Sequence, residues 1–138
     1  MTSAELASLV RDLEDCTLPR KAWTHAAHLS VAVWHLLHYP RDEATKRIRA
    51  GIQRYNASLG NTAGYHETVT LAWIAILAHF LQESPAESAA GELAAEAVKR
   101  FGAARYLSKY FSNQLLFSDL ARKEWVEPDL ASLDDLLP

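Results

Sequence analysis

The stretch "WTHAAHLSVAVWHLLH", residues 23–38, decides the fold of this chain. Thr24 stands where a helix N-cap is expected, directly before a run rich in Ala, Leu, Val and Trp. The run continues to Tyr39 and stops at Pro40, because proline cannot continue a helix. The sequence therefore predicts an apolar helix that begins after Thr24 and ends before Pro40.

Helical patterns flank this stretch on both sides. Before it, Thr2 and Glu5 form a capping box ahead of apolar residues at i, i+3, i+4 and i+7. After it, Asp42 is placed to cap a third helix with an exposed charged face. The most apolar pattern, "YHETVTLAWIAILAHF" at residues 65–80, predicts a central helix that starts near Tyr65.

The second half of the chain also reads as helices joined by short breaks. An alanine-rich helix is expected with Pro85 in its first turn and its end near Phe101. Aromatic and leucine residues predict a further helix over 106–111, followed by a connector over 112–117. Ser118 is then placed to cap a short helix that reaches Trp125.

No segment alternates in the manner of a strand, and no period of 20 to 50 residues recurs. The predicted fold is an all-α, single-domain bundle over residues 1–138, with about six helices and a short C-terminal helix. Residues 126–138 form an acidic tail whose leucines are spaced like one helix face, and it can pack on its own body or on a partner chain. The leucines of this tail are Leu130, Leu133, Leu136 and Leu137.

Composition restricts the function. The 138 residues include 14 Lys and Arg against 17 Asp and Glu, for a net charge of −3, which argues against nucleic-acid binding. The longest apolar run is too short to span a bilayer and no signal peptide is evident, so a cytoplasmic protein without membrane contact is expected. The single Cys16 excludes an internal disulfide and a cysteine-based zinc site.

Histidines are the most distinctive feature, since four of the six lie in the opening stretch. His25 and His28 are three residues apart, so their ring nitrogens can converge on one ion from one helix face. His35 lies two helical turns beyond His28, about 10 Å along the axis, which is too far for the same ion.

A second cluster, "GYHETVT" at residues 64–70, places His66 and Glu67 at the start of the central helix. If the two helix starts meet, His25, His28 and His66 become ligands of a divalent metal, and Glu67 becomes a fourth ligand or the catalytic base. Three histidines with water suit zinc, whereas two histidines with Glu67 suit iron, and the sequence leaves both open. Tyr65, Thr70 and Arg122 are predicted to contact a small polar substrate.

Three segments, "THAAHLSVAVWHLL", "YHETVT" and "LFSDLARKEWVEPDL", resemble a group of small uncharacterised bacterial helical proteins over residues 22–130. The resemblance implies that the segments belong to one unit and implies no reaction. The residues that carry it are Thr24, His25, His28, Tyr65, His66, Thr68, Ser118, Ala121, Arg122, Pro128 and Asp129. A looser architectural likeness to DinB and YfiT type helical bundles implies a divalent metal held by histidines, although here two of them share one helix.

Three functions are compatible with these patterns. The first is a divalent-metal-binding protein, with metal-dependent hydrolysis as its chemistry. The second is a protein in which the same residues transfer protons or bind a small ligand without metal. The third is a non-catalytic interaction module, including a homodimer built on helix faces or on the leucine-bearing tail.

Overall fold

The computed structural model describes residues 1–103 and 105–134, and these residues are helical or irregular, with no strand. The prediction of an all-α fold is confirmed. Five long helices form the body: α1 (Ser3–Glu14), α2 (His25–His38), α3 (Arg41–Ser58), α4 (Glu67–Gln82) and α5 (Ala90–Phe101). The shorter pieces are the 3₁₀ turns η1 (Arg20–Ala22) and η2 (Tyr106–Lys109) and the short helices α6 (Asn113–Leu116) and α7 (Asp119–Lys123).

Three predicted helix starts are confirmed by hydrogen bonds. Thr2 and Glu5 form the reciprocal capping box of α1. The Thr24 hydroxyl accepts from the Ala27 N–H at 3.2 Å, and Ser118 caps α7 in the same way. These caps were predictable because each one depends on residues only three positions apart.

Two predicted helix starts are wrong. Asp42 does not cap α3, because the helix already begins at Arg41 with Pro40 in the N-cap position and no side-chain cap. A proline fixes its own φ near the helical value, so it serves at the edge of a helix without a polar side chain. Pro85 is not in the first turn of α5, which begins at Ala90; the five residues before it form an irregular turn.

The predicted helix over 106–111 is also wrong in type. The chain forms only the 3₁₀ turn η2 there, while the expected connector over 112–117 contains α6. Ser112 caps α6 by accepting from the Leu115 N–H at 3.2 Å, and it also binds Asp129. Ser112 thus separates η2 from α6 and also holds the segment around Asp129. The spacing of apolar residues does not predict such a contact between distant segments.

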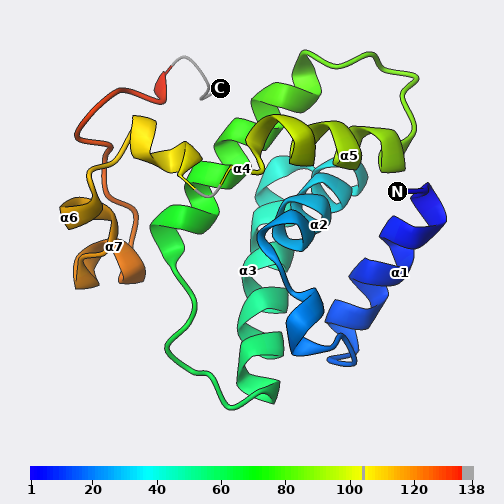
Figure 1. Ribbon diagram of the computed structural model, residues 1–138, viewed down its shortest axis with the longest axis horizontal. Helices are drawn as coiled ribbons and strands as arrows, with labels where there is room; N and C mark the ends of the chain where they lie inside the picture. The colour runs from blue at the N-terminus through cyan, green and yellow to red at the C-terminus, as the bar shows by residue number, and fades with distance from the viewer. Residues whose placement is uncertain (104, 135–138) are drawn as a thin grey trace.

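Helix α2 lies at the centre of the body and contacts α1, α3, α4 and α5 (Figure 1). Most of its residues from Ala27 to His35 are buried, whereas Leu37 near its end is exposed, which explains why the opening stretch lacks a polar face over most of its length. The short helix α7 packs against α4, and α6 and α7 lie together on the side of α4 away from α1 (Figure 1). The start of α4 therefore lies between the body and the C-terminal segment.

The acidic tail packs on its own chain as far as it is described. The Asp129 carboxylate accepts from the N–H and the hydroxyl of Ser112 at 2.7 and 2.6 Å. Leu133 is buried in the main core, whereas Leu130 is exposed. Leu136 and Leu137 lie outside the described residues. Within residues 1–103 and 105–134 no helix combines the length and apolarity needed to cross a membrane.

Candidate functional site

His66 is the N-cap of α4, so it precedes the helix instead of lying on its buried face. Its backbone is extended, with φ −130° and ψ 109°, and its Nδ1 accepts from the Val69 N–H at 3.1 Å. Its Nε2 lies 2.6 Å from the Leu116 carbonyl oxygen, which only accepts, so Nε2 carries the proton. Both ring nitrogens are thus engaged within the protein.

Burial lowers the pKa of His66, and the nearby positive charge of Arg122 lowers it further, although the Leu116 carbonyl acts in the opposite direction. The neutral ring is the form that the N-cap requires, because an imidazolium has no lone pair to accept from Val69. His66 therefore has a structural role at the junction of α4 and α6.

The other two histidines of the predicted metal site have separate surroundings. His25 Nε2 lies 3.2 Å from the Phe101 carbonyl oxygen, and its ring packs on Trp73 at 5.1 Å between centroids. His28 Nδ1 donates to the Thr24 carbonyl at 2.7 Å, and its ring stacks on Trp23. The part of the chain that the structure describes has no group of three His, Cys, Asp or Glu placed to hold a metal ion.

Glu67 is held by two partners. Arg49 of α3 donates to both carboxylate oxygens, at 3.0 Å from Nε to Oε1 and 2.8 Å from Nη2 to Oε2. The Tyr65 hydroxyl donates to Oε1 at 2.5 Å. Burial raises the pKa of Glu67, but the hydrogen bonds from Arg49 and Tyr65 outweigh it and leave the pKa below its ordinary value. Glu67 is therefore an ionised carboxylate at neutral pH.

The Tyr65 hydroxyl donates to Glu67 and keeps its proton at neutral pH. Burial, and then the hydrogen bond to Glu67, raise the pKa of Tyr65 to about 12. Thr70 is close by, and its hydroxyl donates to the His66 carbonyl at 2.8 Å. The Thr70 hydroxyl is therefore directed back to the start of its own helix, where the His66 carbonyl also accepts the Thr70 N–H.

A hollow of about 490 Å³ lies where α3, the loop before α4 and α7 meet. It brings together three residues that the sequence predicted for one site, namely Tyr65, Glu67 and Arg122. The predicted residues His25, His28, His66 and Thr70 do not line it. Its other lining residues, which sequence reasoning missed, are Arg49, Gln53, Thr62, Ala63 and Lys123.

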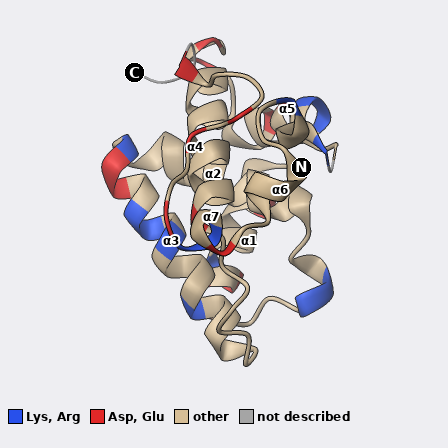
Figure 2. Ribbon diagram, turned by 90° about the vertical axis from the view of Figure 1, so that its left-hand side faces the viewer, with Lys and Arg blue, Asp and Glu red and all other residues tan. Residues whose placement is uncertain are grey.

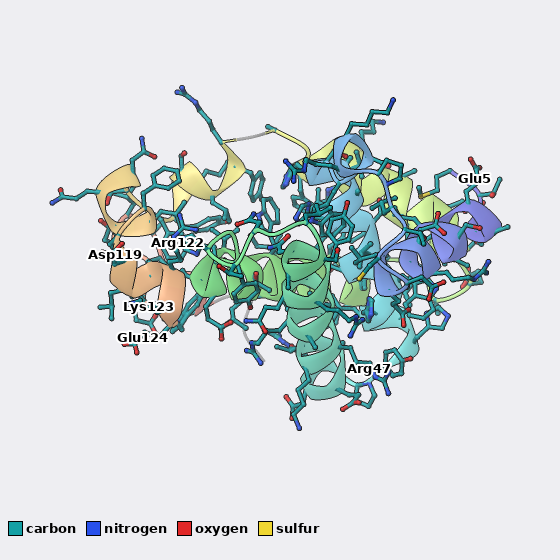
Figure 3. All side chains as sticks on the ribbon, turned by 90° about the horizontal axis from the view of Figure 1, so that it is seen from below. Glu5, Arg47, Asp119, Arg122, Lys123 and Glu124 are labelled. Atoms are coloured by element: carbon teal, nitrogen blue, oxygen red, sulfur yellow. The ribbon has the colours of Figure 1, made fainter. Side chains whose placement is uncertain are left out.

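Positive charge is in excess in this hollow. Arg49, Arg122 and Lys123 face a single carboxylate, Glu67, whose charge is balanced by Arg49. Neither Arg122 nor Lys123 forms an ion pair with any carboxylate in residues 1–103 and 105–134. Among the described residues, the Arg122 side chain donates to the Ala63 carbonyl alone, at a long 3.3 Å. Figure 3 shows Arg122 and Lys123 together on α7, at the opposite end of the molecule from Glu5 of α1.

The signal for the missed cations was weak. Arg49 lies on α3, where blue segments recur along the helix in Figure 2, and nothing local distinguishes it from its charged neighbours. Glu43 and Arg47, four residues apart, form the surface ion pair that their spacing predicts, at 3.0 Å. Arg49 instead pairs with a residue 18 positions away, and only the docking of α4 selects it.

The three stretches that carry the resemblance, residues 24–37, 65–70 and 116–130, meet around the start of α4. Thr68 is fully buried; its hydroxyl donates to the Glu124 carbonyl at 2.8 Å and accepts from the Val126 N–H at 3.2 Å. His25 shares a second hollow, of about 440 Å³, with Leu116. A comparison of the chain with known protein families, with curated proteins and with solved structures finds no match.

Proposed function

We propose that this protein binds a small anionic molecule, a carboxylate or a phosphate, in the hollow between α3, α4 and α7. The observation that carries the proposal is the excess of cations there: Arg122 and Lys123 remain without a carboxylate partner among the described residues, after Arg49 has balanced Glu67. Charge-assisted hydrogen bonds from arginine to an anion are short and about twice as strong as neutral ones.

The size and the remaining lining support a small ligand. A volume of about 490 Å³ is within the range of ligand pockets, about 300–1,000 Å³. Gln53 and Thr62 add uncharged donors at the wall. The Arg49–Glu67 pair fixes one side of the hollow, so part of the site is formed before a ligand arrives.

Proton states favour binding over proton transfer by these residues. A general base works best when its pKa lies near the working pH. Glu67 has a pKa below its ordinary value, and Tyr65 holds its proton with a pKa of about 12. This supports the metal-free ligand-binding function that the sequence left open, with Tyr65, Glu67 and Arg122 in the site.

Metal-dependent hydrolysis stays a prediction. It requires His66 to release both the Val69 N–H and the Leu116 carbonyl before its ring can turn toward a metal shared with His25 and His28. No contact among the described residues supplies a reason for that rearrangement.

The test is a titration of the full chain with inorganic phosphate and with succinate. Isothermal calorimetry measures the affinity, and amide chemical shifts locate the binding site. We expect a Kd of about 1 mM or lower, which corresponds to roughly −4 kcal/mol. Shifts should concentrate around Arg122, Lys123 and Tyr65. Binding should weaken as salt is added, because the site is open and its charges are screened.

The variant for this test is Arg122→Ala/Lys123→Ala, which removes both cations of α7. The matched control is Arg11→Ala/Lys99→Ala, which removes the same charge from exposed positions outside the hollow. Each lost charge-assisted hydrogen bond is worth about 1.5–3 kcal/mol, so the α7 variant should bind at least about tenfold more weakly. Equal affinities in the two variants, or no binding of either anion to the native chain, would overturn the proposal.

A further inference from the structure

A separate, more enclosed hollow of about 260 Å³ lies between α1, α2 and α3. Leu13, Val31 and Ile48 provide apolar wall, and Glu14, Arg47 and Arg54 add charged groups. His35 also lines it, although this side chain is only 5% exposed. A buried imidazole at the edge of a hollow can form a hydrogen bond with a molecule bound there.

The ring of His35 is fixed, and one nitrogen is unused by the described residues. Its Nδ1 lies 2.8 Å from the Val31 carbonyl oxygen, which only accepts, so Nδ1 carries a proton. No residue in 1–103 or 105–134 donates to Nε2. Every fully buried side-chain nitrogen in these residues has a hydrogen-bond partner, so an Nε2 without one cannot be fully buried. Nε2 is therefore accessible, and the hollow is the space that His35 borders.

Gly51 independently marks this space as unfilled. It is a buried residue in the middle of α3, and a Cβ built on it would meet no atom within 4 Å. Glycine inside a helix costs about 1 kcal/mol relative to alanine. The chain thus carries a helix-weakening residue where a side chain would project into the hollow beside His35.

We propose that this hollow binds a small neutral molecule with a hydroxyl group, an alcohol or a phenol, whose O–H donates to His35 Nε2. The apolar wall formed by Leu13, Val31 and Ile48 covers the hydrocarbon part of the ligand. An apolar cavity of about 150 Å³ holds a benzene ring, so the volume here is sufficient for one ring with a substituent.

The charges around the hollow favour a neutral ligand over an anion. Burial lowers the pKa of His35, so the ring is neutral and its Nε2 lone pair repels a carboxylate. The Arg47 guanidinium is already engaged with Glu43 and lies over the Tyr39 ring at 4.2 Å. Glu14 and Arg54 line the same hollow with opposite charges, so neither sign is in excess there once Arg47 is paired with Glu43.

The experiment uses phenol and toluene as matched probes, one with and one without a hydroxyl donor. Amide and imidazole shifts of the full chain are followed during each titration. Phenol should shift the His35 Nε2 resonance and the amides of Leu13, Val31 and Ile48, with a Kd of about 1 mM. Toluene should bind about five- to tenfold more weakly, because it lacks a hydrogen bond worth about 1 kcal/mol.

Two variants separate the contributions of the ring and the space. His35→Phe keeps the ring and removes the acceptor, so phenol should lose its advantage over toluene. Gly51→Leu fills the floor and should abolish saturable binding of both probes, whereas Ala57→Leu, at an exposed position of the same helix, should not. Absence of saturable phenol shifts in the native chain, or unchanged binding in Gly51→Leu, would overturn the inference. This test is independent of the anion-binding proposal, because the two hollows share no lining residue.

Discussion

The guanidinium of Arg49 and the carboxylate of Glu67 face each other through two parallel hydrogen bonds, of 3.0 and 2.8 Å. The pair joins α3 to the first residue of α4 across the loop that carries Tyr65. The side chain of Glu67 is 17% exposed and that of Arg49 34%, so the pair is shielded more than an ordinary surface pair. It determines where one wall of the hollow between α3, α4 and α7 lies.

Replacing Arg49 with lysine should destabilise the protein by about 1–2 kcal/mol, because lysine cannot form the paired hydrogen bonds of a guanidinium. The matched control is Arg47→Lys on the same helix, whose partner Glu43 is far more exposed. That change should cost less than the change at Arg49, at most about 0.5–1 kcal/mol, because the Arg47 pair is exposed and only the contact of Arg47 with the Tyr39 ring adds to it. Urea unfolding measures both, and equal losses in the two variants would contradict the role assigned to Arg49.

Replacing His66 tests its two structural bonds separately. His66→Asn retains a good N-cap for α4 and loses the bond to the Leu116 carbonyl, whereas His66→Ala loses both. Loss of an N-cap costs about 0.5–2 kcal/mol, so the stability should fall in the order native, Asn, Ala. Thermal unfolding measures this order. If both variants are as stable as the native chain, the ring has no structural function and remains available for another one.

The sequence predicted what depends on neighbours and missed what depends on docking. The caps at Thr2, Thr24 and Ser118 follow from local hydrogen bonds, and the all-α fold follows from apolar periodicity. The sequence predicted His66 at the start of the central helix, as a metal ligand together with His25 and His28. As the N-cap it has extended backbone, so its ring turns to its own helix end and to Leu116.

The hollow between α3, α4 and α7 likewise combines residues that the sequence could predict with residues that it could not. The sequence could group Tyr65 with Glu67 because they lie in one short motif, and it could propose Arg122 because a guanidinium suits a substrate anion. Arg49 lies on the helix that was predicted to have an exposed charged face, and periodicity alone does not reveal which of its charges a later helix will contact. Lys123 is adjacent to Arg122 in sequence, but only the placement of α7 against α4 brings it to the hollow.

Thr68→Val should destabilise the protein by about 1–3 kcal/mol, although the two side chains have almost the same shape. Thr68 is fully buried, and its hydroxyl serves the Glu124 carbonyl and the Val126 N–H. Valine leaves both backbone groups without that partner in a partly buried place. Hydrogen exchange of the Val126 amide should accelerate with the loss of stability, and Thr68→Ser should retain most of it. A Val variant with native exchange would show that this contact does not hold the C-terminal segment.

Gly51→Ala should stabilise the protein by about 0.5–1 kcal/mol. Alanine is the better helix former, and its methyl group enters open space without meeting an atom within 4 Å. The same change at Gly91 provides the contrast, because a Cβ there would lie 2.5 Å from the Met1 carbonyl oxygen and should destabilise the protein. Urea unfolding compares the two. A destabilised Gly51→Ala variant would mean that the hollow beside His35 is closed in solution.

Acidification should destabilise the fold before any carboxylate is protonated. Burial lowers the pKa of His28, His35 and His66 below the ordinary 6.5. The unfolded chain therefore takes up protons from about pH 6.5 downward while the folded chain does not, so stability is complete above that pH and declines as the pH falls toward the folded values. Each such proton contributes a slope of about 1.4 kcal/mol per pH unit.

Urea unfolding between about pH 8 and pH 5 measures this decline. His35→Phe should flatten the curve by up to one proton, because the phenyl ring has no site to protonate in either state. Glu67 adds a later decline, since its lowered pKa preserves its contribution above the ordinary 4.5 and loses it as the pH falls through the folded value. A stability that rises on acidification below neutral pH would contradict the assignment of these rings as neutral, buried groups.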